Sequence, residues 1–206
     1  MIDVNDDGRL RIVTINRPEK ANSLTRDMLE VLAETVEAAN ADDGVHAIVL
    51  TGAGKVFSAG ADLEAAKAGL ATDPVWERLS SAVADSPVLT IAALNGTAAG
   101  GALGMVFACD LRVATRETKI FYPVMKLGFL PQPSDPVRCA ALVGPARAKL
   151  ILMAGQKIEA AEAMSIGLVD RISDDPLETA KALASDVLSA SRAHVEGIKA
   201  LTRLAR

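Results

Sequence analysis

The 206-residue chain is poor in aromatic residues, with one Trp, one Tyr and four Phe, and its formal net charge is −4. It contains no run of basic residues. A nucleic-acid surface needs clustered Lys and Arg with stacking rings, so the composition argues against binding DNA or RNA. Half of the residues are hydrophobic and 23% are charged, which supports a large core and argues against global disorder.

Cysteine and histidine are also scarce. Cys109 and Cys139 form no CxxC motif and indicate no disulfide framework. We therefore expect a reducing compartment, most simply the cytoplasm, and the acidic N-terminal sequence lacks the apolar core of a signal peptide. His46 and His194 lack metal-ligand spacing with Cys or carboxylates, so we expect no metal site.

Charge is absent from residues 86–109, a stretch long enough to span a bilayer. The turn signal Asn95-Gly96 lies in its middle, and Gly100, Gly101 and Gly104 follow soon after. We interpret the stretch as a buried strand, a turn and a buried helix, and expect no membrane span.

Strands alternate with helices along the sequence. Hydrophobic and β-branched patterns predict strands at 9–16, 45–52, 88–96 and 111–115. Apolar residues at helical spacing predict a helix at about 26–41, capped by Ser23 or Thr25. Further helices are expected to begin at Asp62, Asp73-Pro74, Ser134-Asp135-Pro136 and Asp175-Pro176.

This alternation indicates an α/β domain, with a core over residues 1–172 and a short helical C-terminal segment over 173–206. The segment has apolar residues with which it is expected to dock on the core, namely Leu183, Val187, Ile198, Leu201 and Leu204.

Two loops rich in small residues, FSAGADL (57–63) and NGTAAGGALG (95–104), each follow a predicted strand and open a predicted helix. The first N–H groups of a helix lack intrahelical acceptors, so adjacent turns of this kind can donate two hydrogen bonds to one carbonyl oxygen as it becomes an oxyanion. The alternative is tight packing of helix on strand. A dinucleotide fingerprint is excluded because Ala99 stands at its first glycine, and a phosphate loop because Val56 follows Lys55.

Four stretches in order, NRPEKANSL, FSAGADL, NGTAAGGALGMVFACDLRVAT and AAEAMSIGLVDRI, resemble the crotonase superfamily, the enoyl-CoA hydratase/isomerase family. The resemblance covers about residues 9–172. It implies an α/β spiral of repeated β-β-α units, homotrimers or dimers of trimers, and acyl-CoA substrates, with coenzyme A as part of the thioester and no other cofactor. It assigns the oxyanion hole to the backbone amides of Ala61 and Gly101.

The resemblance also implies residues that border the CoA moiety: Lys20, Ala21, Ala59, Asp62, Leu63 and Gly100. Lys20 or Arg17 is a candidate to meet a CoA phosphate, with a solvated loop charge as the alternative for both.

The acid–base groups depart from the family pattern. Family hydratases use two glutamates, and the matching positions here are Gly104 and Val124, neither of which can carry a proton. Some relatives, including an aryl-CoA dehalogenase, place an aspartate where this chain has Gln132. Because general acid–base groups contribute about 10²–10⁴-fold each, the sequence favours isomerisation or other enolate chemistry over hydration.

Nearby carboxylates offer alternatives. Asp135 precedes Pro136 and is interpreted first as a helix N-cap and second as a catalytic group. Asp62 is expected to start a helix, and Glu64, one turn on, is a weaker catalytic candidate. Two functions therefore remain open: an acyl-CoA-processing enzyme, or a catalytically silent acyl-CoA-binding or assembly subunit.

Overall fold

The computed structural model describes residues 1–202, in which the larger of two sheets has six strands in the order β1-β2-β3-β5-β7-β10. The strand β1 pairs antiparallel with β2, and the remaining neighbours pair in parallel. The bounds are Ile2–Asp7 (β1), Leu10–Ile15 (β2), Ala47–Gly52 (β3), Leu89–Leu94 (β5), Leu111–Ala114 (β7) and Arg171–Ile172 (β10).

A smaller sheet of short strands lies beside it, in the order β4-β6-β8-β9. Its strands are Val56–Ser58 (β4), Thr97–Ala99 (β6), Lys119–Phe121 (β8) and Ile158–Glu159 (β9), and the first three run parallel. Each of β3, β5 and β7 continues into one strand of the smaller sheet and then into helices. This repeated β-β-α path confirms the expected spiral.

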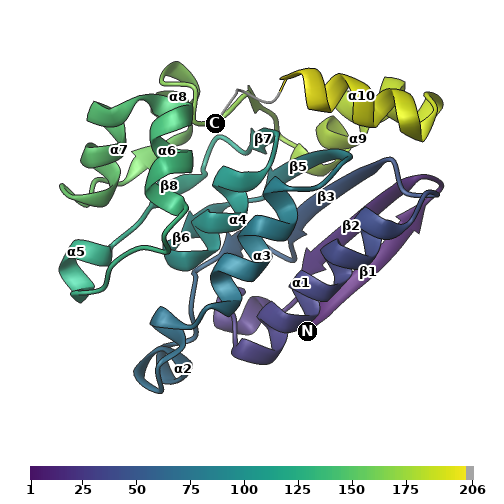
Figure 1. Cartoon of the computed structure of the whole chain (residues 1–206). Helices are drawn as coiled ribbons and strands as arrows, with labels where there is room; N and C mark the ends of the chain where they lie inside the picture. Colours follow the sequence, from purple (N-terminus) through teal and green to yellow (C-terminus); the bar gives the residue numbers. More distant parts are fainter. Residues whose placement is uncertain (203–206) are drawn as a thin grey trace.

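Helices cover both faces of the larger sheet (Figure 1). On one face lie α1 (Arg26–Ala41), α3 (Val75–Ala84) and α4 (Leu103–Ala108), and on the other lies α9 (Pro176–Ser189). Side chains alternate along a strand, so Ile48 and Leu50 join the first core, whereas Ala47 and Val49 pack toward α9. Burial on both faces explains why β3 reads as a continuous apolar run.

The remaining helices have fewer than ten residues, apart from the C-terminal α10. They are α2 (Leu63–Lys67), α5 (Val124–Leu127), α6 (Asp135–Val143), α7 (Pro145–Leu152), α8 (Ala160–Ser165) and α10 (Arg192–Thr202), with 3-10 turns η1 (Pro18–Lys20), η2 (Leu70–Thr72) and η3 (Gly100–Ala102).

Several expected helix starts are confirmed. Thr25 caps α1, since its side chain accepts a hydrogen bond from the Met28 N–H. Asp62 caps α2 and Asp175 caps α9 in the same way. The uncharged stretch forms β5, a turn, β6, η3 and α4, and no helix within residues 1–202 is long and apolar enough to cross a bilayer.

Other expectations are wrong. The sequence did not predict β1, nor the short strands β4, β6 and β8. In the C-terminal segment, Leu183 and Val187 pack on the core, but Ile198 and Leu201 are 53% and 86% exposed. Ile198 borders the cavity under α10, whereas Leu201 makes no such contact, and the buried apolar residue of α10 is Val195. Leu204 lies outside the described residues.

Candidate active site

The ends of three parallel strands define the site. Because β4 pairs with β6 and β6 with β8, their carboxyl ends meet at one edge of the smaller sheet. The turns that follow, residues 59–61, 100–101 and 122–123, all line one cavity. Ligands commonly bind outside the carboxyl ends of parallel strands, so this edge is the first place to look for chemistry.

In the first turn, the hydrogen bonds to Leu24 involve the residues on either side of Ala61 and leave the Ala61 N–H out. Gly60 has a φ of +89°, a left-handed conformation that glycine adopts without strain. Leu24 donates its N–H to the Gly60 carbonyl and accepts from the Asp62 N–H, both at 2.8 Å. Ala61 lies between these two bonds, in a parallel bridge with Leu24, so its own N–H points away from Leu24.

The second turn begins with Gly100, at a φ of +59°, and enters η3. The Gly101 N–H belongs to the first turn of that helix, where no intrahelical acceptor exists. The ring of Trp76 packs against Gly101, since a Cβ at this position would lie 3.2 Å from three ring atoms. Gly101 is therefore the residue that lets the turn and the ring approach each other.

The two turns are in contact with each other. A Cβ built on Gly60 would lie 2.7 Å from the Ala99 carbonyl oxygen and 3.3 Å from the Gly101 nitrogen. Glycine at position 60 thus allows one turn to pack directly on the other. Ala61 and Gly101, the two residues whose amides the sequence assigns to an oxyanion hole, both line this cavity.

The cavity has a volume of about 250 Å³ and is largely apolar. Tyr122 and Gln132 are its polar side chains besides the indole of Trp76, whose N–H donates to the Leu70 carbonyl. No carboxylate is among the described residues that line it. The lining residues are Ala59, Ala61, Leu63, Ala66, Ala71, Trp76, Gly100, Gly101, Tyr122, Pro123, Val124, Leu127, Phe129, Leu130 and Gln132.

The segment expected to border CoA lies against the first turn. The Ala59 N–H donates to the Ala21 carbonyl at 3.0 Å, which joins the two segments. The Arg17 guanidinium donates to Asp62 at 2.9 Å, and this contact lowers the pKa of the Asp62 carboxyl. Arg17 is therefore engaged by protein, whereas Lys20 is exposed and Leu63 projects at the cavity edge.

The structure corrects the first interpretation of Asp135. Asp135 is the first residue of α6, but Ser134 holds the cap position and no side chain caps this helix. The Asp135 carboxyl is fully buried and turns inward, because the Tyr122 hydroxyl donates to its Oδ2 at 2.8 Å. Asp135 is therefore not an N-cap.

Burial changes how Asp135 and Tyr122 titrate. Loss of hydration raises the pKa of the Asp135 carboxyl to about 6, an effect that the hydrogen bond from Tyr122 and the charge of Arg138 partly offset. Burial and the neighbouring carboxyl raise the pKa of the Tyr122 hydroxyl well above its usual range. Tyr122 thus stays protonated at neutral pH, while Asp135 can exchange a proton.

The other acid–base candidates are placed differently. Glu64 is exposed, pairs with Lys67 at 2.9 Å and does not line the cavity. Val124 lines the cavity without a polar atom, and Gln132 donates its amide N–H to the Ala71 carbonyl at 3.2 Å. The sequence predicts Trp76 on the inner face of a helix and Tyr122 as a possible hydrogen-bond donor, but it does not show that both line this cavity.

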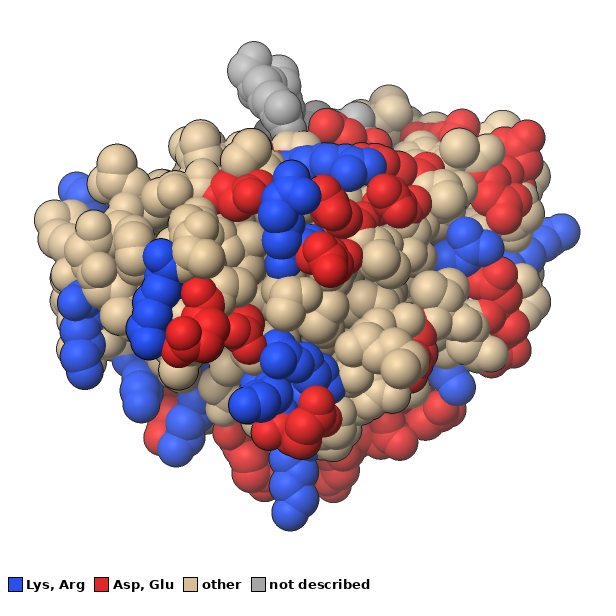
Figure 2. All heavy atoms as spheres, turned by 90° about the horizontal axis from the view of Figure 1, so that it is seen from below, with Lys and Arg blue, Asp and Glu red and all other residues tan. Residues whose placement is uncertain are grey.

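Other features of the described residues lie apart from the two turns. Among residues 1–202, no group of three or more His, Cys, Asp and Glu residues has metal-binding geometry. A larger cavity of about 440 Å³ lies under α10 and touches neither turn. On the face in Figure 2, acidic and basic side chains are interspersed rather than gathered by sign.

A β-β-α spiral with two convergent small-residue turns defines a crotonase-type protein. A sequence model described as enoyl-CoA hydratase/isomerase matches residues 7–204. A short-chain-enoyl-CoA hydratase of Clostridium acetobutylicum is 35% identical over 195 residues, covering 89% of this chain and 73% of the relative.

Solved structures agree with this assignment. Pseudomonas aeruginosa DspI is 34% identical with a TM-score of 0.89, over 97% of this chain and 85% of that one. An enoyl-CoA hydratase/isomerase from Mycobacterium paratuberculosis is 30% identical with a TM-score of 0.90, over 97% and 83% of the two chains. This chain belongs to the enoyl-CoA hydratase/isomerase family, and it is accordingly an enzyme of acyl-CoA metabolism.

Proposed function

We propose that this enzyme stabilises the enolate of an acyl-CoA thioester between the backbone amides of Ala61 and Gly101. The observation that carries the proposal is the contact between the two turns, with Gly60 packed on Gly101. Two preorganised N–H donors on an apolar wall suit a carbonyl oxygen that gains negative charge. Loss of one such donor typically costs about 10²–10³ in rate.

We further propose that the thioester enters with its CoA moiety along the segments around Lys20, Ala21 and Ala59. The hydrogen bond between Ala59 and Ala21 supports this path, because it joins the segment around Lys20 to a residue that lines the cavity. Gly100 lies on the same wall of the cavity. No cofactor beyond the CoA of the substrate enters this proposal.

The proposed reaction class is isomerisation or another enolate reaction rather than hydration. Hydration needs one group to activate water and another to protonate carbon, and the apolar lining at Val124 supplies neither. The name hydratase belongs to the relatives. In the described part of this chain, the one hydrogen-bonded pair that can carry a proton next to the cavity, Tyr122 and Asp135, suits a reaction that moves one proton.

A second candidate is a silent acyl-CoA-binding subunit. One observation favours it: the described cavity lining holds no carboxylate. Binding without turnover distinguishes this candidate from the enzyme.

The test is a panel of 2-enoyl-, 3-enoyl-, malonyl-type and aryl-CoA thioesters, followed by mass spectrometry. Trp76, the single tryptophan, reports binding through its fluorescence because its ring faces the cavity. We expect a fluorescence change on binding, and conversion of at least one of these thioesters by a reaction other than hydration. Binding without turnover across the panel would favour the silent subunit.

A matched pair of variants tests the turn itself. In Gly101→Ala the new methyl would press on Trp76, and displacement of the amide by a few tenths of an ångström should reduce kcat/KM about tenfold. Gly197→Ala on α10 meets no atom within 4 Å and should leave kcat/KM unchanged. Equal rates in both variants would contradict the role of the Gly101 amide.

We also propose a homotrimer or a dimer of trimers in the cytoplasm. Exposed Met125, Leu127 and Leu130 near the cavity mouth support association, and the buried thiols of Cys109 and Cys139 suit a reducing compartment. Light scattering measures the assembly.

A further inference from the structure

The Asp135 carboxyl, at the start of α6, is buried next to the cavity although it does not cap its helix. Asp135 is fully buried, and its Oδ1 has no hydrogen-bond partner among the described residues. An unpaired buried carboxyl oxygen is costly, since burial removes its hydration. Because Asp135 does not cap its helix, this cost calls for another explanation.

The absence of a side chain at Gly104 makes room for this carboxyl. A Cβ at Gly104 would lie 2.8 Å from Oδ1 and 3.3 Å from Oδ2 of Asp135. Gly104 is one helical turn beyond Gly101, which lines the cavity. The carboxyl of α6 therefore reaches the helix that begins at the second turn.

Tyr122 connects this carboxyl to the cavity. It follows β8, lines the cavity, and donates its hydroxyl to Asp135 at 2.8 Å. Among the described lining residues, Tyr122 is the one with a titratable side chain. A proton can thus move from the cavity to Oδ2 through one hydroxyl.

We propose that Tyr122 is the catalytic proton donor and acceptor of this site and that Asp135 is its positioning residue, which stores the transferred proton. The inference rests on the proposed enolate chemistry. As the C–H bond of the acyl α-carbon breaks, its electron pair remains as the enolate. Its proton passes to the Tyr122 oxygen while the Tyr122 proton passes to Asp135. Reversal of both transfers returns a proton to carbon.

The concerted transfer fits the electrostatics. A free tyrosinate is disfavoured because burial and Asp135 raise the pKa of Tyr122, but none forms when both protons move together. Asp135 is suited to accept a proton near neutral pH, since its pKa is about 6. The titratable groups around it are Glu77 of α3, which raises its pKa, Arg138 of α6, which lowers it, and the Cys139 thiol.

The experiment follows exchange of the α-hydrogens of butanoyl-CoA in D2O by mass spectrometry, with the full-length enzyme. The variants are Asp135→Asn and Tyr122→Phe, which preserve side-chain shape, and thermal unfolding checks their folding. Asp110→Asn is the control, because Asp110 is a partly buried carboxyl paired with Lys199 and remote from this cavity. Binding is read from Trp76 fluorescence.

We expect exchange by the wild type at a rate that rises with pH through about 6, as Asp135 becomes able to accept a proton. Asp135→Asn and Tyr122→Phe should slow exchange at least about a hundredfold while butanoyl-CoA binding persists. Asp135→Asn should also lose the inflection near pH 6, which a structural role alone would not remove. Asp110→Asn should behave as the wild type.

Exchange by Asp135→Asn at the wild-type rate, with the inflection retained, would overturn the relay and leave the enolate proposal standing. Binding of butanoyl-CoA without exchange by the wild type would overturn the relay and favour the silent subunit. Absence of both binding and exchange would overturn both proposals.

Discussion

The Asp135 carboxyl occupies the space into which a side chain at position 104 would extend. The sequence places Gly104 and Asp135 thirty-one positions apart and does not reveal that they meet. An aspartate before proline at a helix start matches the pattern of an N-cap. Only the inward turn of the side chain toward Tyr122 distinguishes the two roles.

Stability should depend on pH through Asp135. Its folded pKa of about 6 lies above the ordinary value of 3.8, so the folded state binds this proton more tightly. The resulting stabilisation is present below pH 4 and is lost as pH rises through 6.

Asp135→Asn removes this titration. Relative to the wild type, the variant should gain about 2 kcal/mol in unfolding free energy between pH 4 and pH 7. Urea unfolding at several pH values measures the difference. Parallel curves for the two proteins would contradict the raised pKa.

At the scale of elements, the long helices and the strands of the larger sheet are predictable because their apolar periods are clear. The strands β4, β6 and β8 each have three residues, too few to show alternation, and two of them lie beside glycine-rich turns. These strands form because the folded chain brings them side by side, which the local sequence does not show. The two turns were nevertheless recognisable, because each places small residues between a predicted strand and a predicted helix and their order matches the family resemblance.

Asn22 holds the 17–24 segment against β4. It is fully buried at a φ of +54°, donates to the Ala53 and Val56 carbonyls at 2.9 and 2.6 Å, and accepts from the Arg17 N–H. Asn22→Ala loses all three bonds and strains the backbone. We expect a loss of about 3 kcal/mol in unfolding free energy.

Asn22→Gly is the matched control, because it loses the same bonds without the left-handed strain. It should be about 1 kcal/mol less destabilised than Asn22→Ala. Chemical denaturation compares them, and an unchanged midpoint in Asn22→Ala would show that the segment is held by other contacts.

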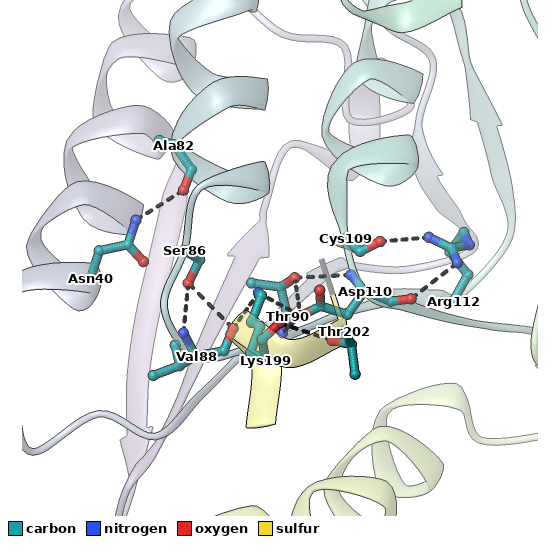
Figure 3. A network of polar contacts seen from close by, with 10 residues as sticks. All are labelled: Asn40, Ala82, Ser86, Val88, Thr90, Cys109, Asp110, Arg112, Lys199 and Thr202. Carbon is teal, nitrogen blue, oxygen red and sulfur yellow. Dashed lines mark hydrogen bonds and ion pairs between the residues drawn. The ribbon is translucent and has the colours of Figure 1, made fainter. Parts of the chain in front are cut away.

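At the scale of the whole molecule, polar contacts hold α10 to the core. Figure 3 shows Lys199 reaching the Asp110 carboxyl and the Val88 carbonyl, each at 2.6 Å. Asp110 also accepts from the N–H and hydroxyl of Thr90. Apolar periodicity cannot predict this polar attachment, and it therefore did not reveal that Leu201 stays exposed.

Lys199→Met keeps the aliphatic stem and removes the charge. Because the Lys199 and Asp110 side chains are 12% and 32% exposed, we expect a loss of about 1 kcal/mol in stability. Amide hydrogen exchange should accelerate in α10 and stay unchanged in α1. Unchanged protection of α10 would contradict the role of Lys199.

The spiral distributes the proposed chemistry over successive turns of the chain. The amides proposed to polarise the carbonyl follow β4 and β6, whereas the proposed proton-handling pair follows β8. Substitutions confined to residues 122–135 can therefore change the proposed proton transfer while the proposed hydrogen bonds to the thioester carbonyl oxygen are kept. The proposed oxyanion contacts and the proposed proton-handling pair can thus be varied separately on one scaffold.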